Sequence, residues 1–235
     1  MHSFTFNGIN SRDYCELFVS GGGTFNAPER DIESVSVPGR NGELTVDNGR
    51  YKNISVEYPA WIAHDFARNA AKARAWLTSQ KGYKRLEDDY APQEYRMARF
   101  VNGLEFSTIA GHVAGATTIK FDCMPQRFLK SGEETVLFSL PSGVIINPTM
   151  FDSEPIITVS GSGSGSLTIN GSAITLSDIV DYVVLNSEIK RAYKDLTPKD
   201  DTMVGTFPIF IPGENTISFS GNITGLSVVP RWWTL

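Results

Sequence analysis

Short segments in which apolar and polar residues alternate make up most of this 235-residue chain. Side chains of a β-strand point alternately to opposite faces, so this period of two predicts strands with one buried face. Residues 31–37 and 43–46 show the pattern on either side of a turn-rich break at 38–42, and residues 53–58 repeat it. The alternation therefore predicts a mainly β protein whose strands are joined by turns rich in glycine, proline and asparagine.

One segment, from about His64 to Gln80, follows a helical period instead. Its apolar residues recur at intervals of three and four: Phe66, Ala70, Ala73 and Leu77. This spacing predicts an α-helix with one buried side, and Gly82 lies where a C-terminal cap is expected. The opposite side is predicted to be an ordinary exposed face, with the basic residues Arg68, Lys72 and Arg74.

Two further β features are predicted before residue 125. Asn102-Gly103 is a strong type I′ hairpin signal, which predicts a hairpin between strands at 95–101 and 104–109. Residues 117–123 alternate again, and this pattern predicts a strand that turns Ile119, Phe121 and Cys123 inward.

Between about residues 140 and 155 the sequence shows few helix or strand patterns, and Pro141, Pro148 and Pro155 interrupt it. We therefore predict two domains, residues 1–140 and 141–235. The second begins as a β-meander, in which the Gly/Ser run at 160–166 is predicted to be a long hairpin tip. A flexible linker is the alternative for this run.

Composition narrows the class of protein. A net charge of −5 argues against a nucleic-acid binder. Cys15 and Cys123 are too few for a disulfide framework, so two reduced, buried thiols are predicted. The chain opens with no secretory signal and contains no apolar stretch of membrane-spanning length, so we expect it to be made and to stay at first in a cytoplasm.

Catalytic and metal-binding patterns are missing from the sequence. His2, His64 and His112 are widely separated and belong to no ligand motif, so no catalytic, cofactor or metal residue is predicted. The acidic run Glu87–Asp89 is the one candidate for an enzyme, a cell-wall hydrolase using paired carboxylates. A charge-balanced turn is the favoured interpretation of this run, because basic residues precede it at 84–85.

The chain ends in Trp232-Trp233-Thr234-Leu235. Chain ends are usually polar and frayed, whereas each buried tryptophan removes roughly 150–250 Å² from water. The pair therefore predicts a C-terminus anchored in a core or against a partner.

Several motifs follow one another in a recognisable order. They are Phe6–Ser11, Val37–Leu44, Asn147–Thr149, Ile169–Gly171, Asn186–Glu188, Tyr193–Lys194, Phe207–Pro208, Pro212–Asn215 and Pro230–Trp233. Together they cover the chain and resemble the distal tail proteins of long, non-contractile-tailed bacteriophages and prophages. The positions taken as the family signature are Pro38, Gly39, Arg40, Gly42, Pro148, Pro212, Gly213, Asn215, Pro230, Arg231, Trp232 and Trp233.

The resemblance implies a fold: a tail-tube-like β-sandwich with one α-helix and a β-hairpin, followed by a galectin-like β-sandwich. In such a protein the N-terminal domain would form a ring, and Trp232 and Trp233 would complete a core. They would not form a sugar-stacking platform.

The resemblance also implies a function. The chain would be a non-enzymatic hub of the virion's distal tail tip, assembled in the host bacterial cytoplasm as a homo-hexamer. It would join the tail tube protein to the tail-associated lysin or tip protein, with receptor-binding proteins as further partners. DNA would pass through the ring without specific binding, and no cofactor or membrane insertion is implied. The alternative is a carbohydrate-binding module that aids adsorption to the host.

Overall fold

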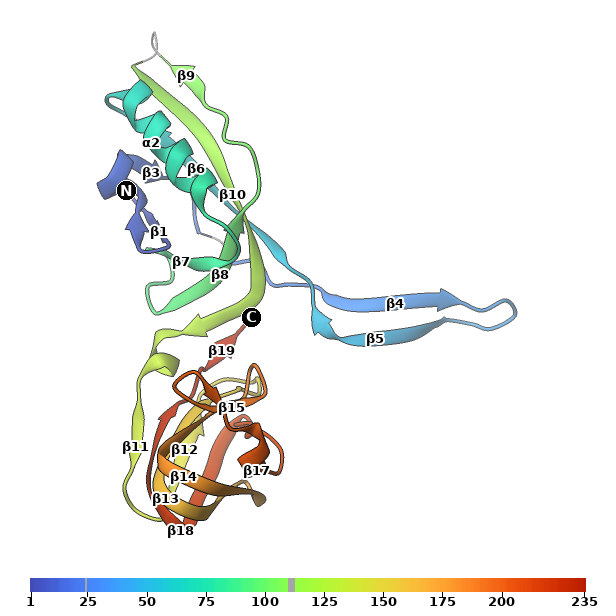
Figure 1. Ribbon diagram of the computed structural model, residues 1–235. Coiled ribbons are helices and arrows are strands. Elements are labelled where there is room, and N and C mark those ends of the chain that lie inside the picture. Colours follow the sequence, from blue (N-terminus) through green and yellow to red (C-terminus); the bar gives the residue numbers. More distant parts are fainter. Residues whose placement is uncertain (24, 110–112) are drawn as a thin grey trace. The chain divides into compact units, whose positions relative to one another are not determined.

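The chain forms two compact units in a computed structural model that describes residues 1–23, 25–109 and 113–235 (Figure 1). The first unit contains residues 1–127 and Leu235, and the second contains residues 128–234. The division precedes the predicted one at 140/141, because β11 (Val136–Phe138) already pairs with β18 (Gly213–Val229) of the second unit. The predicted class, mainly β with few helices, is confirmed.

The first unit is built on one large sheet. Strand order is β2-β1-β7-β8-β10-β6-β3, with β9 beside β10. The strands are β1 (Phe4–Phe6), β2 (Ile9–Asn10), β3 (Leu17–Val19), β6 (Ile54–Ile62), β7 (Lys84–Asp88), β8 (Glu94–Phe100), β9 (Ser107–Ile109) and β10 (Ala114–Leu129). The helices are α1 (Ser11–Cys15) and α2 (Phe66–Ser79), and α2 lies along the sheet in Figure 1.

The core of the first unit follows the predicted alternation. Ile54, Val56 and Tyr58 of β6 are buried. Their partners in the neighbouring strand β10 are Cys123, Phe121 and Ile119, respectively. The buried residues of α2 include Ala70, Ala73 and Leu77, so the predicted helix and its apolar side are confirmed. Gly82 does not cap this helix, because the helix ends at Ser79 and the next residue, Gln80, is already extended.

The predicted hairpin at Asn102-Gly103 is wrong. Strand β8 lies between β7 and β10, and β9 pairs with Ala114–Ala116 of β10 and with no other described strand. A type I′ turn needs positive φ at both central residues, and neither Asn102 nor Gly103 has it. Asn7-Gly8 does form such a turn, with φ of 50° and 78°, between the paired residues Phe6 and Ile9.

Strands β4 (Arg30–Ser36) and β5 (Glu43–Tyr51) form a two-stranded sheet of their own. The sequence predicts these strands and the turn between them, but it also predicts one buried face. That second prediction is wrong: no residue from Arg30 to Arg50 is buried, and Tyr51 is only half-buried. No second layer covers either face of this hairpin within the described chain.

The second unit is one curled antiparallel sheet wrapped around its own core (Figure 1). Strand order is β11-β18-β13-β14-β15-β16, with β12 beside β18 and β17 beside β14. The other strands of this sheet are β12 (Ser142–Asn147), β13 (Ile156–Ile169), β14 (Ser172–Asn186), β15 (Arg191–Lys194), β16 (Thr197–Pro198) and β17 (Met203–Val204). Two 3-10 helices, η1 (Lys130–Glu133) and η2 (Asp200–Thr202), accompany them, and the short strand β19 (Trp233–Thr234) pairs with β10 instead.

The Gly/Ser run at 160–166 is neither a hairpin tip nor a linker. It lies inside β13, which pairs with β14 on one side and with β18 on the other. The pairing shifts register near Gly161 and Gly165, where a Cβ would collide with backbone or side-chain atoms of β18. Glycine is therefore required by close packing here, and the hairpin turn falls at Asn170-Gly171 instead.

The two cysteines are free and buried, as predicted. Burial raises the pKa of the Cys15 thiol to about 11 and that of Cys123 to about 12. No helix in the described part of the chain is long and apolar enough to cross a membrane.

Candidate assembly surface

The turn that joins β4 to β5 is built from the signature residues at 38–42. Gly39 and Gly42 have φ of 80° and 79°, a conformation that favours glycine. The backbone N–H of Arg40 donates to the Val37 carbonyl oxygen at 3.2 Å, which closes the first bend. Pro38, Gly39, Arg40 and Gly42 thus shape the tip of the hairpin, and all four are exposed.

Three of the four aliphatic side chains in β4 and β5 lie on one face of the hairpin. Val35 pairs directly with Leu44, and Val46 pairs with Glu33, so these four side chains share a face. Val35, Leu44 and Val46 are 48%, 46% and 46% exposed. The opposite face carries Ile32 among polar residues: Ser34, Ser36, Glu43, Thr45 and Asp47.

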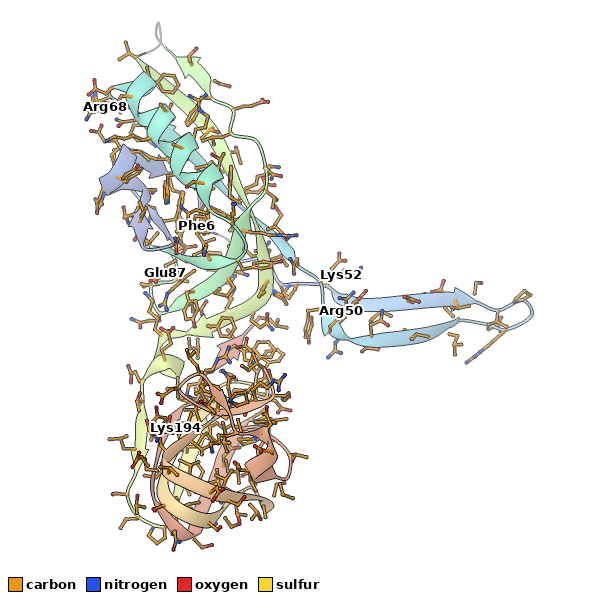
Figure 2. All side chains as sticks on the ribbon, viewed as in Figure 1. Phe6, Arg50, Lys52, Arg68, Glu87 and Lys194 are labelled. Carbon is orange, nitrogen blue, oxygen red and sulfur yellow. The ribbon has the colours of Figure 1, made fainter. Side chains whose placement is uncertain are left out.

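Charged contacts fix the base of the hairpin. Arg30 donates to Asp47 at 2.9 Å and also lies over the Tyr51 ring, 5.0 Å from its centroid. Arg50 donates to Asp31 at 2.7 Å, and this hydrogen bond lowers the pKa of the Asp31 carboxyl. Figure 2 shows Arg50 at this end of β5. Both arginines and Asp47 are exposed, and only Asp31 is half-buried, so these pairs orient the strands more than they stabilise them.

An isolated two-stranded hairpin is only marginally stable in water. This hairpin has no covering layer within the described residues, yet it presents an apolar stripe of Val35, Leu44 and Val46. Two exposed strand edges add unpaired backbone groups, which readily pair with another chain. The hairpin is therefore the candidate assembly surface. The sequence shows its alternation, but alternation does not tell whether a strand's apolar face is covered by its own chain.

The signature residues of the second unit shape its loops. The buried Asn215 side chain accepts from the Ile211 N–H and donates to the Ile211 and Gly213 carbonyl oxygens. It also accepts from the Asn170 side chain at 2.7 Å. Pro212, Gly213 and Pro148 are exposed beside these contacts. Nothing in this loop resembles a reacting centre.

The terminal tryptophans have different environments. Trp232 is 5% exposed and packs in the core of the second unit, with its ring centroid 5.7 Å from that of Phe210. Trp233 is half-buried: it stacks on Phe151 at 4.5 Å, and its indole N–H donates to the Asp152 carbonyl oxygen at 2.8 Å. The predicted core position therefore holds for Trp232, whereas Trp233 lies at the edge.

The two residues before them fix the chain's path into this core. Pro230 accepts at its carbonyl oxygen from the buried Ser153 hydroxyl at 2.8 Å. The backbone N–H of Arg231 donates to the Gly132 carbonyl oxygen at 2.7 Å. The guanidinium of Arg231 lies 2.7 Å from a carboxylate oxygen of Glu188. Both residues are structural anchors for the terminal segment.

The acidic run at 87–89, labelled at Glu87 in Figure 2, is engaged in structural contacts. Glu87 accepts from Arg85 at 2.6 Å. Asp88 accepts from the Tyr58 hydroxyl at 2.7 Å, and Asp89 accepts from the Ser3 backbone and hydroxyl. These contacts favour a structural role over paired catalytic carboxylates.

The histidines form no site in the described part of the chain. His2 stacks on Tyr90 with centroids 4.3 Å apart, and the His64 carbonyl oxygen accepts from Asn69. His112 lies outside the described residues. Across 1–23, 25–109 and 113–235, no three His, Cys, Asp or Glu residues gather in a way that could hold a metal ion.

Proteins of similar fold are found among solved structures, but not among related sequences. The sequence matches no protein-family model and no curated protein. The crystal structure of the SPP1 Dit (gp 19.1) protein, described as a paradigm of the hub adsorption apparatus in Gram-positive infecting phages, matches with a TM-score of 0.79. The two share 12% identity, over 100% of both chains. A chain of the phage P2 baseplate, in its activated conformation with Ca, matches with a TM-score of 0.54 at 9% identity, over 97% of both chains. This chain therefore shares its fold with hub and baseplate proteins of bacteriophages.

Proposed function

We propose that this chain is a structural hub protein of a bacteriophage's distal tail tip, with no enzymatic activity. Copies close into a six-membered ring that joins the tail tube protein to the tail-associated lysin or tip protein. The observation that carries the proposal is the fold shared with the SPP1 Dit protein over the full length of both chains. The ordered sequence motifs support it independently, because they resemble distal tail proteins from end to end.

The β4–β5 hairpin gives the proposal a physical basis. Its apolar stripe of Val35, Leu44 and Val46 is exposed in a single chain, and burying each such side chain is worth about 1.5–3 kcal/mol when complete. A head-to-tail contact repeated around a closed ring would cover this face in every copy. Closure also uses up strand edges that would otherwise pair without limit.

The two units would have different roles in the assembly. The first unit, which carries the hairpin, closes the ring, and the second meets other tail-tip components such as receptor-binding proteins. The net charge of −5 suits a ring through which DNA passes, because an acidic wall does not retain a polyanion. The protein would reside in the virion after assembly in the host bacterial cytoplasm.

The test is the solution mass of the full chain at rising concentration, measured with and without the tip protein. The proposal predicts a species of six chain masses, formed by the chain alone or on addition of the tip protein. A strict monomer under both conditions, together with tight binding of an oligosaccharide, would overturn it in favour of a carbohydrate-binding module.

A further inference from the structure

Arg96 occupies a core position in β8. Strand β8 alternates so that Arg96 and Ala98 turn inward, and Arg96 is only 6% exposed. Neither of its two terminal guanidinium nitrogens has a hydrogen-bond partner among residues 1–23, 25–109 and 113–235. Leaving two buried N–H-bearing nitrogens without an acceptor is unfavourable, so they point to an acceptor in the space beside them.

A small cavity lies against this guanidinium. Its volume is ≈ 20 Å³, which exceeds the roughly 10–15 Å³ that one water molecule needs. It is lined by Tyr58, Leu86, Asp88, Ala91, Glu94, Tyr95, Arg96 and Arg127. The cavity therefore has room for a single occupant of about the size of a water molecule or a monatomic ion.

Two cationic side chains, Arg96 and Arg127, line the cavity together with two carboxylates, Asp88 and Glu94, and their contacts decide what it can hold. Burial is the largest cause that lowers the pKa of the Arg96 guanidinium, and repulsion from Arg127 is the second. Attraction to Asp88 raises this pKa, but by less than either of them lowers it. Asp88 already accepts from the Tyr58 hydroxyl and from the backbone N–H groups of Tyr90 and Ala91. Glu94 is the second carboxylate that lines the cavity, and it accepts from the Arg127 guanidinium at 3.3 Å. No described carboxylate contacts the terminal nitrogens of Arg96.

We propose that this cavity is a binding site for one monovalent anion of chloride size, held by the two terminal nitrogens of Arg96. The guanidinium fork offers two N–H groups in one plane to a single acceptor, which is the geometry that anion sites use. The bound ion accepts from the two terminal nitrogens, which have no hydrogen-bond partner among the described residues. It thereby stabilises the first unit without taking part in any reaction.

The direct test is ³⁵Cl nuclear magnetic resonance of the full chain in sodium chloride, because exchange of chloride onto a protein site broadens its resonance. We expect excess line width for the wild type and its loss in Arg96→Met. The matched control is Arg99→Met on the same strand. Arg99 is exposed and donates to Asp122 at 2.6 Å, so this variant should keep the excess width.

Two outcomes would overturn the proposal. Equal broadening in the wild type and in a folded Arg96→Met variant would show adventitious surface binding only. No excess broadening in the wild type would show that the cavity holds water. If circular dichroism shows Arg96→Met to be unfolded, wild-type crystals grown in sodium bromide decide instead. Anomalous scattering should then locate one bromide against the Arg96 guanidinium, and an empty or water-filled cavity would contradict the site.

Discussion

The β4–β5 hairpin and the β13–β14–β18 sheet are both long antiparallel ribbons, but only the second has a covered face. Ile157, Val159 and Leu167 of β13 are fully buried, whereas Val35 and Leu44 of the hairpin are nearly half exposed. The same period of two is present in both sequences. The difference teaches that alternation alone does not decide burial: the apolar face of β13 is covered within its own unit, whereas no described residue covers the hairpin face.

The largest expected effect is in the core of the second unit, where the apolar face of the sheet is covered. Replacing Trp232 with alanine removes a buried ring that packs against Phe210, so we expect a loss of about 3–5 kcal/mol in the free energy of unfolding. Urea denaturation measures it. Trp233→Ala is the control and should cost less, since Trp233 is half-buried. Equal costs for the two variants would contradict a core that depends on Trp232.

The next effect tests why β13 carries glycines. A Cβ at Gly165 would lie 2.6 Å from Ile223 Cγ1 and 2.8 Å from the Ser220 carbonyl oxygen. Gly165→Ala should therefore destabilise the protein by about 1–3 kcal/mol, as overpacking does. Gly103→Ala is the matched control, because no described atom lies within 4 Å of a Cβ there. If both substitutions are equally tolerated in thermal unfolding, the Gly/Ser run is not needed for close packing.

A smaller effect concerns pH in the first unit. Unfolded thiols lose their protons near pH 9.0, but Cys15 and Cys123 keep theirs in the folded state up to about 11 and 12. Above pH 9 the unfolded chain binds fewer protons than the folded chain, so the free energy of unfolding should fall as pH rises. Cys123→Ala should flatten that fall between pH 9 and 11. An unchanged slope in this variant would show that other groups, such as Tyr58, control it.

The smallest effect is expected in the hairpin itself. Val35→Ser should change the free energy of unfolding of the dispersed single chain by no more than about 0.5 kcal/mol, because its side chain is already half exposed. Denaturant titration at low protein concentration measures this. A cost similar to that of Trp232→Ala would mean that the hairpin face is covered within its own chain.

Three of the five Asn-Gly pairs in the chain show how far the sequence predicts the fold. Asn7-Gly8 and Asn170-Gly171 form turns with positive φ at both residues, between partners that the sheet aligns. Asn102-Gly103 carries the same local signal, yet the sheet inserts β8 between β7 and β10 and no hairpin forms. Local turn chemistry thus predicts a conformation that long-range strand pairing can override.

The candidate surface was only partly predictable for a related reason. Alternation at 31–37 and 43–46 predicts the strands, but burial depends on a second layer that lies elsewhere in the sequence or in another chain. Arg96 gives no sequence signal at all. Only the fold shows that β8 turns its side chain into the core, where its two terminal nitrogens have no hydrogen-bond partner among the described residues.

The central claim is that the Val35–Leu44 face of the hairpin is buried between copies of this chain. The measurement that tests it most directly is the solution mass of three proteins at a concentration where the wild type assembles. We expect the double variant Val35→Ser with Leu44→Ser to remain monomeric. Ile32→Ser, on the opposite face, should assemble as the wild type does. Full assembly of the double variant, or failure of both variants alike, would contradict the account.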